Sequence, residues 1–306
     1  MAAQISIALP QAPSLGVRVR DLVTLAKPRI TLMVLITAAG GMWLGHRAGV
    51  GTALNGTTAG LALLGISLIV SGANALNMVI ERDIDKHMSR TKNRPLPAGR
   101  MHMRTALVFG AGLSVLAVPV LLISTNILTT FLAVLANLLY VFAYTPLKQR
   151  SHHALLVGAV PGAIPPLLGW TATTDRLDAA GLTLFGILFL WQVPHFLAIA
   201  LFRRSDYANA GLFVMPNVRP IPQVKQAIVS YTLALVLVSL LLVPLHVAGG
   251  FYLVAAAAFG CAFLGTALLG FGAPDDDVKW PRSLFLASLL YLVALIGVLV
   301  LDVTLA

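Results

Sequence analysis

Residues 59–85 read AGLALLGISLIVSGANALNMVIERDID, a long apolar run that ends in a cluster of acids. A helix needs ~20 mostly apolar residues to cross the hydrocarbon core of a membrane, and residues 59–80 supply them. Similar runs recur along the chain, and they are far longer than the ~10-residue alternating segments of a membrane barrel. We therefore predict an all-α polytopic membrane protein with about nine spans, at residues 29–48, 59–80, 104–123, 126–145, 154–173, 180–201, 226–246, 249–271 and 283–303.

The composition agrees with a membrane protein. Hydrophobic residues make up 58% of the 306 residues and charged residues only 10%, whereas about a quarter of an average soluble domain is charged. These values exclude a soluble globular enzyme, a disordered chain and a nucleic-acid-binding protein. The single cysteine excludes an internal disulfide framework and a cysteine-based metal site.

The basic residues fall almost entirely on one side of the predicted spans. Nineteen of the 21 lie in the N-terminal tail or in the loops after the second, fourth, sixth and eighth spans, and only Arg47 and Arg176 lie on the other side. Loops rich in Lys and Arg stay in the cytoplasm, so we predict a cytoplasmic N-terminus and a C-terminus outside. We divide the chain into a cytoplasmic tail, 1–28, and a transmembrane domain, 29–306.

An acidic cluster stands at the end of the second span. Asn77, Glu81 and Asp85 are spaced by four residues, which places them on one face of a helix, whereas Asp83 falls on the far side. Neighbouring bases could simply neutralise these carboxylates, as on many solvated helix ends. Alternatively, the oxygen atoms could bind Mg²⁺, which uses one or two carboxylates and takes its other ligands from water and substrate phosphate. The spacing alone does not separate the two interpretations.

Basic residues follow the acids in two cytoplasmic loops. Prolines at 95 and 97 stiffen the first loop, so its cations are held in a restricted place. Acids for Mg²⁺ beside bases for phosphate oxygens are the components of a diphosphate site, although bases in these loops also serve as orientation signals. The candidate diphosphate ligands here are Arg90, Lys92, Arg94, Arg100, Lys148 and Arg150.

Two other features concern the fifth and sixth spans. The fifth is dense in Gly and Pro, which favours either a kinked packing helix or a cavity wall. The sixth ends in the stretch WQVPHF, residues 191–196, followed by Arg203, Asp206 and Tyr207. Ionisable groups near spans are functional candidates, but a lone histidine such as His195 is more often structural. A functional His195 would ligate haem iron or assist proton transfer.

Several of these stretches resemble motifs of a known family. The sequence NMVIERDID at 77–85, followed by RTKNRPL at 90–96, resembles the first motif of the UbiA-type intramembrane prenyltransferases and of their haem-farnesylating branch in particular. Three further stretches agree, and the resemblance covers the chain from about Pro28 to the last span. These stretches are YTPLKQRS at 144–151, GAIPPLLGW at 162–170, and WQVPHF at 191–196 with Asp206, Tyr207, Met215 and Pro216 downstream.

The resemblance implies an activity. It implies that the chain transfers the farnesyl group of farnesyl diphosphate to a vinyl group of haem B, with addition of water, and forms haem O in a UbiA-like bundle of the cell (inner) membrane. The active site would face the cytoplasm, Mg²⁺ would be the cofactor, and a haem A synthase or terminal oxidase would be nearby.

The resemblance also implies roles for individual residues. Asn77, Glu81 and Asp85 would hold Mg²⁺, but Glu81 is one methylene longer than the Asp that the family usually has, so it would bind through water or Asp83 would help. His195 would be catalytic, as a candidate base. The diphosphate would be bound by Arg90, Lys92, Arg94, Lys148, Arg150, Arg203, Asp206 and Tyr207.

Two other functions compete with this one. A prenyltransferase for aromatic or quinone precursors generally has a second Asp-rich motif in the loop after span 6, where this chain has only Asp206. A secondary transporter would favour acids or broken helices at the membrane midplane. Here the carboxylates gather instead at the cytoplasmic edge.

Overall fold

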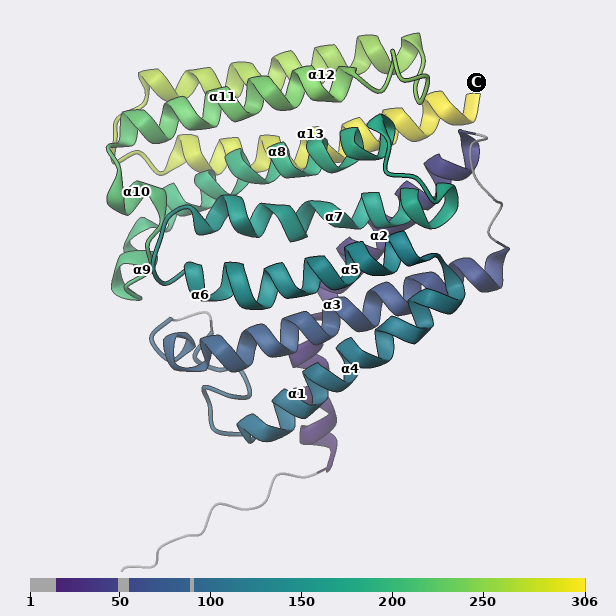
Figure 1. Cartoon of the computed structure of the whole chain (residues 1–306). Helices are drawn as coiled ribbons and strands as arrows, with labels where there is room; N and C mark the ends of the chain where they lie inside the picture. Colours follow the sequence, from purple (N-terminus) through teal and green to yellow (C-terminus); the bar gives the residue numbers. More distant parts are fainter. Residues whose placement is uncertain (1–14, 49–54, 89–90, 306) are drawn as a thin grey trace, which may run out of the picture.

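The computed structural model describes residues 15–48, 55–88 and 91–305, and this part of the chain is helical without a strand (Figure 1). Three short helices lie outside the spans, namely α1 (Leu15–Ala26), α9 (Arg204–Asn209) and α10 (Met215–Val218). The spanning segments are α2 (Pro28–Arg47), α3 (Gly56–Asp85), α4 (Met103–Ser124), α5 (Ile127–Leu138) with η1 (Leu139–Tyr144) and α6 (Thr145–Leu147), α7 (Ala154–Thr174), α8 (Ala179–Phe202), α11 (Ile221–Leu240), α12 (Gly250–Leu268) with η2 (Leu269–Gly272), and α13 (Lys279–Leu305).

The predicted count is confirmed, because nine helical segments of the described residues are long and apolar enough to cross a membrane. One predicted position is wrong. The seventh span was expected at 226–246, but α11 runs from Ile221 to Leu240. Proline explains the shift: Pro222 fits the first turn of a helix, whereas Pro244 would lie in the interior of the predicted span.

Small residues allow α2 and α7 to pack closely. Gly41 of α2 lies against the carbonyl oxygen of Pro166, and Gly169 of α7 lies against the carbonyl oxygen of Ala38, so a Cβ at either glycine would collide with backbone. Close approach at small residues is a common way to join membrane helices. Although α7 contains Pro161, Pro165 and Pro166, it is a continuous helix and one of the more deeply buried spans.

The helix α1 occupies part of the predicted N-terminal tail. Its Leu25 is fully buried and packs with Ala75 and Met78 of α3. The apolar contact holds the junction between α1 and α2 beside the acidic end of α3. The division of the chain at residue 28 remains a prediction.

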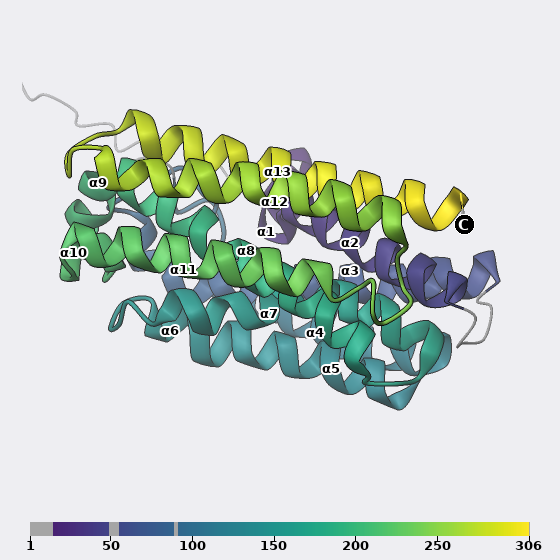
Figure 2. The same ribbon diagram turned by 90° about the horizontal axis from the view of Figure 1, so that it is seen from above.

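The polar ends of the helices are segregated. Figure 1 shows α6, α9, α10 and the C-terminal end of α3 at one end of the bundle, whereas the C-terminus of α13 lies at the other, and Figure 2 gives the same separation from above. We call the first end the basic end, because Lys148, Arg203 and Lys279 lie there; the acidic residue Asp85 lies at the same end. It is the end predicted to face the cytoplasm.

Candidate active site

The acidic face of α3 forms the centre of the site. The helix continues to Asp85, so Asn77, Glu81 and Asp85 do share one face, and only 2%, 5% and 2% of their respective surfaces are exposed. Asn74, one turn earlier, donates to the carbonyl oxygen of Ala26 at 3.4 Å. Buried carboxylates need cationic or hydrogen-bonding partners. Two other segments supply cations to Glu81 and Asp85, and a third supplies one to Asn77.

The first partner is Lys148, which follows α6. Its Nζ lies 3.1 Å from Oε1 of Glu81. Burial opposes the charge on this amine, but the phenol of Tyr144 and the carboxylate of Glu81 raise the pKa of Lys148 above its ordinary value. Lys148 is therefore a protonated cation at neutral pH, as its predicted role in binding a diphosphate requires. Tyr207 of α9 also contributes to this raised pKa.

The second partner is Arg94, in the proline-stiffened loop after α3. Its Nη1 lies 2.7 Å from Oδ2 of Asp85. The loop is tied to α3 again by Thr91, whose hydroxyl donates to the carbonyl oxygen of Asp85 at 2.9 Å. Arg100 donates at 3.3 Å to the buried Asp21 of α1 and at 3.0 Å to the carbonyl oxygen of Asn93. These contacts hold the loop against the helix ends, so Arg94 is fixed rather than freely solvated.

The third partner, Lys27, was missed as a site residue by the sequence analysis, which counted it only as an orientation charge. Its Nζ donates to Oδ1 of Asn77 at 2.8 Å. Its backbone has φ 49° and ψ 63°, the left-handed conformation that residues other than glycine rarely adopt. Burial and the positive charge of Arg94 lower the pKa of Lys27 to about 8, although Glu81 opposes the shift. A backbone outlier that aims a partly buried amine at a polar cluster is characteristic of functional sites.

The balance of charge favours an anionic ligand. Lys27, Arg94 and Lys148 bring three cationic side chains to the two carboxylates of Glu81 and Asp85. Each carboxylate uses one oxygen for its cation. Among the described residues, the other oxygen of each has no hydrogen-bond donor and is not sealed from solvent. The cluster therefore has a surplus of positive charge and two free carboxylate oxygens.

The donor set fits Mg²⁺. Two carboxylates and one amide supply oxygen only, which is the ligand type that this ion prefers. Within residues 15–48, 55–88 and 91–305, no three His, Cys, Asp or Glu side chains are grouped to hold a metal ion by themselves. Mg²⁺ ordinarily keeps water and substrate phosphate among its ligands, so two carboxylates are enough for an ion that arrives with a diphosphate.

The structure does not bring Asp83 to this cluster. Its side chain is 65% exposed and pairs with Arg82 at 3.2 Å and with Lys86 at 2.8 Å, on the other side of α3. Lys92 and Arg150 are exposed at the basic end and form no ion pair with the described residues. Arg90 lies outside the described residues.

The short helix α9 and its N-cap Arg203 carry the three remaining candidates on one face. Arg203 and Asp206 form an exposed pair at 3.1 Å, and Tyr207, the next residue after Asp206, contributes to the raised pKa of Lys148. The opposite face, with Arg204, Ser205 and Ala208, lines a pocket of about 580 Å³. Of the three predicted residues in this loop, Tyr207 acts electrostatically on Lys148, and none forms an ion pair with Glu81 or Asp85 among the described residues.

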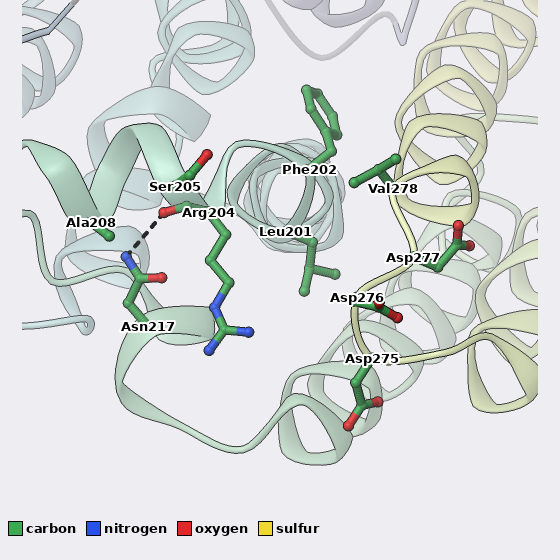
Figure 3. Close-up of a pocket in the computed structure, with 10 residues that line it drawn as sticks. All are labelled: Leu201, Phe202, Arg204, Ser205, Ala208, Asn217, Asp275, Asp276, Asp277 and Val278. Atoms are coloured by element: carbon green, nitrogen blue, oxygen red, sulfur yellow. Dashed lines mark hydrogen bonds between the residues drawn. The ribbon is translucent and has the colours of Figure 1, made fainter.

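The pocket is bounded on its far side by the acidic run Asp275–Asp277 (Figure 3). In that view Arg204 extends between Asn217 and the acidic loop. Asp275 pairs with the buried Lys225 at 2.8 Å, and Asp277 accepts from the first backbone N–H groups of α13. Two of the three acids therefore stabilise the loop and the start of a helix, and the run is separate from the site on α3.

Two tyrosines of the fourth span lie in the segment that packs beside α3. The fourth span changes from α-helix to π-helix at Leu139–Tyr144, and the rings of Tyr140 and Tyr144 lie 5.3 Å apart. Thr145, which follows, links Tyr140 to Asn77: it accepts from the Asn77 amide at 3.1 Å and donates to the Tyr140 carbonyl at 2.7 Å. Single turns of π-helix are frequent at functional sites, but no sequence signal marked this one.

His195 lies in a different, aromatic environment. It is buried in α8, and its Nδ1 is 2.8 Å from the hydroxyl of Ser288 in α13. The ring of Trp191 stacks on it at 4.6 Å, and Phe285 lies at 4.8 Å. The structure describes no contact between His195 and the acidic cluster. His195 therefore lies apart from the acidic cluster, in an aromatic environment between α8 and α13.

Comparison with known proteins identifies a family. Residues 34–289 match the model of the UbiA prenyltransferase family. The chain is 47% identical to the protoheme IX farnesyltransferase of Myxococcus xanthus, over 95% of this chain and 97% of that protein. It is 49% identical to the protein of the same name from Sorangium cellulosum, over 88% of this chain and all of the relative.

Solved structures show the same fold. A digeranylgeranylglyceryl phosphate synthase aligns with a TM-score of 0.80 at 15% identity, over 93% of this chain and 98% of that one. A UbiA homolog from Archaeoglobus fulgidus, bound to GPP and Mg²⁺, aligns with a TM-score of 0.64 at 14% identity, over 91% of this chain and 99% of that one. That structure shows that the fold can hold a prenyl diphosphate together with Mg²⁺.

Proposed function

Because the chain belongs to the UbiA prenyltransferase family, we propose that this membrane enzyme transfers the farnesyl group of farnesyl diphosphate to a vinyl group of haem B. The relatives that match it over nearly their whole length carry the name of this reaction. The observation that carries the proposal for the site is the buried pair Glu81 and Asp85. Among the described residues, each has one cation on one oxygen and no donor on the other.

The reaction balances as one farnesyl diphosphate, one haem B and one water giving haem O and diphosphate. The bond between C1 of farnesyl and its oxygen breaks, and the electron pair leaves with the diphosphate. The vinyl π-bond of haem then forms a new bond to C1, which leaves a cation next to the porphyrin ring. Water adds to that cation and loses a proton, so the product carries a hydroxyl group.

The cations of the basic end act on the leaving group. Lys27, Arg94 and Lys148 would hold the diphosphate oxygens and stabilise the negative charge that develops as the C1–O bond breaks. Mg²⁺, held by Asn77, Glu81 and Asp85, would add a further positive charge at the same oxygens. The exposed residues Lys92, Arg150, Arg203 and Asp206 are outer candidates for the diphosphate, as is Arg90 from its place in the sequence. Tyr207 is the inner candidate, because it contributes to the raised pKa of Lys148.

The apolar bundle protects the reactive intermediate. An allylic cation is quenched by water, so it must form where water is scarce. A bundle of apolar spans provides such surroundings and admits two hydrophobic substrates from the bilayer. We assign to His195, which is buried among Trp191 and Phe285, the role of receiving the proton lost when water adds to the haem side chain.

We propose the cell (inner) membrane as the location, with the basic end in the cytoplasm. The segregation of Lys148, Arg203 and Lys279 to one end supports this orientation. The domain boundary at residue 28 belongs to the same proposal. By analogy with the family, we propose a haem A synthase or terminal oxidase as the partner that receives the product.

The direct test uses the purified full-length protein in detergent or nanodiscs with farnesyl diphosphate, haem B and Mg²⁺. Mass spectrometry of the extracted haem should detect haem O, and the product should be absent after chelation of Mg²⁺ and should return when Mg²⁺ is restored. A well-folded preparation that leaves haem B unchanged would overturn the assignment. Product formation from a quinone-precursor acid in place of haem would favour the related branch of the family.

A further inference from the structure

The hydroxyl of Ser288 links two helices that are distant in sequence. Ser288 lies in α13, is fully buried, and its Oγ is 2.8 Å from Nδ1 of His195 in α8. The same oxygen lies 2.6 Å from the backbone carbonyl of Phe285. Its role follows from the direction of these two hydrogen bonds.

The carbonyl of Phe285 fixes where the serine proton goes. A carbonyl oxygen can only accept a hydrogen bond, and a hydroxyl has a single proton to donate. The proton of Ser288 therefore points to Phe285, and Ser288 accepts from His195. Nδ1 of the imidazole then carries the ring proton. In the neutral ring the lone pair is left on Nε2.

The surroundings hold the ring in one orientation. Trp191 stacks on the imidazole at 4.6 Å, and its indole Nε1 donates to the backbone carbonyl of Ser288 at 2.7 Å. Ser288 therefore fixes the ring through its hydroxyl and fixes the stacking partner through its backbone. Among the described residues, Nε2 of His195 has no hydrogen-bond partner, and it is not sealed from solvent. An oriented ring with one free basic nitrogen is the arrangement of a proton acceptor.

We propose that Ser288 is a positioning residue, which holds His195 as the Nδ1–H tautomer and leaves Nε2 as the acceptor for the proton released when water adds to the haem side chain. The proposal rests on the role of His195 given under the proposed function. In this step the water oxygen bonds to the side-chain cation and one water proton passes to Nε2. The transient imidazolium still donates from Nδ1 to Ser288.

A purely structural bond makes a different prediction. If Ser288 only joined α8 to α13, its loss would lower the thermal stability and leave the state of the imidazole unchanged. Serine hydroxyls that bond within a single helix serve as a reference. Ser124 of α4 is one of these, since it is buried and donates to the carbonyl of Val120 in its own helix at 2.7 Å.

The test compares Ser288→Ala, Ser288→Thr and the matched control Ser124→Ala. Nitrogen NMR of histidine-labelled protein, assigned by difference from His195→Gln, should show a protonated Nδ1 in the wild type and a mixture of tautomers in Ser288→Ala. The turnover number of Ser288→Ala should fall about 10–100-fold, the usual effect of losing a residue that orients a catalytic group. KM for farnesyl diphosphate should not change. Ser288→Thr, which keeps the hydroxyl, should restore the wild-type tautomer.

Different results would refute the proposed function and the positioning role of Ser288. The tautomer is measured without turnover, so a wild-type enzyme that makes no haem O would refute the proposed function and leave the assignment of Nδ1 intact. An unchanged imidazole spectrum and turnover number in Ser288→Ala would overturn the positioning role. A lower thermal midpoint with both readouts unchanged would identify Ser288 as a structural link between spans.

Discussion

Two buried carboxylates at opposite ends of the bundle, Asp85 and Asp302, have different partners. Asp302 near the end of α13 is 7% exposed, and both of its oxygens accept from backbone N–H groups, those of Gly249 and Tyr252. Asp85 at the end of α3 is 2% exposed, but it pairs with Arg94 through one oxygen only. The two carboxylates are thus similarly buried, but they differ in how many of their oxygens are hydrogen-bonded among the described residues.

The difference separates a structural acid from a candidate ligand. Asp302 caps the first turn of α12, so its hydrogen-bonding capacity is satisfied within the fold. Among the described residues, one oxygen of Asp85 has no hydrogen-bond donor, and Asp85 stands among cations that exceed the acids in number. A carboxylate oxygen that the fold leaves without a hydrogen-bond donor is available to a ligand.

Replacement of Asp85 by Asn is the strongest test of this distinction. The substitution removes the charge next to Arg94 and one candidate metal ligand, so we expect turnover to fall at least about 10²–10³-fold, as for loss of one preorganised electrostatic group. The thermal midpoint and the size-exclusion profile should remain close to those of the wild type. Haem O formation, measured by mass spectrometry, checks the loss, and full activity in this variant would make the acidic face structural.

Replacement of Lys27 by Met should have the next largest effect. A hydrogen bond from a charged group contributes about 1.5–3 kcal/mol, so kcat/KM for farnesyl diphosphate should fall about 10–100-fold. The matched control is Arg29→Met, which removes an exposed base two residues away. Equal losses in the two variants would mean that position 27 contributes only general positive charge.

The fold was largely predictable from the sequence because each span carries its own signal. Length and apolar composition located nine segments, and the comparisons confirm the resemblance to the UbiA family. The seventh span was displaced because hydropathy does not distinguish apolar helix from apolar turn around Pro244. Neither the close contact of Gly41 with Pro166 nor the π-helix at Leu139–Tyr144 has a periodic signature, so both required the structure.

The site was predictable only where its residues share a helix. The spacing of Asn77, Glu81 and Asp85 gave their common face and placed Asp83 away from it, as the structure shows. Contacts between distant segments could not be predicted from the sequence. Lys27 is hydrogen-bonded to Asn77, 50 positions away, and His195 to Ser288, 93 positions away. No local pattern encodes such pairs, since they arise from the packing of whole helices.

Replacement of Asp302 by Ala should affect stability rather than catalysis. The change removes the acceptor for two backbone N–H groups at the start of α12, and loss of such a cap costs about 1–2 kcal/mol. We expect a lower thermal midpoint and an unchanged turnover number per folded molecule. Asp302→Asn, which keeps one acceptor oxygen, should lose less stability. A specific loss of turnover without a loss of stability would show that Asp302 is not only a cap.

Replacement of Asp83 by Asn should have the smallest effect, although this residue is only two positions from Asp85. Its carboxylate is 65% exposed and its partners Arg82 and Lys86 are themselves solvated, and exposed ion pairs of this kind contribute little. Turnover should stay within about twofold of the wild type, as expected for the loss of a solvent-screened pair. The Mg²⁺ dependence of product formation should be unchanged. If Asp83→Asn instead raised the Mg²⁺ requirement as Asp85→Asn is expected to do, the ion would be held from both sides of α3. The burial of a carboxylate and its unpaired oxygen would then no longer distinguish a Mg²⁺ ligand from a carboxylate that does not bind the ion at this helix end.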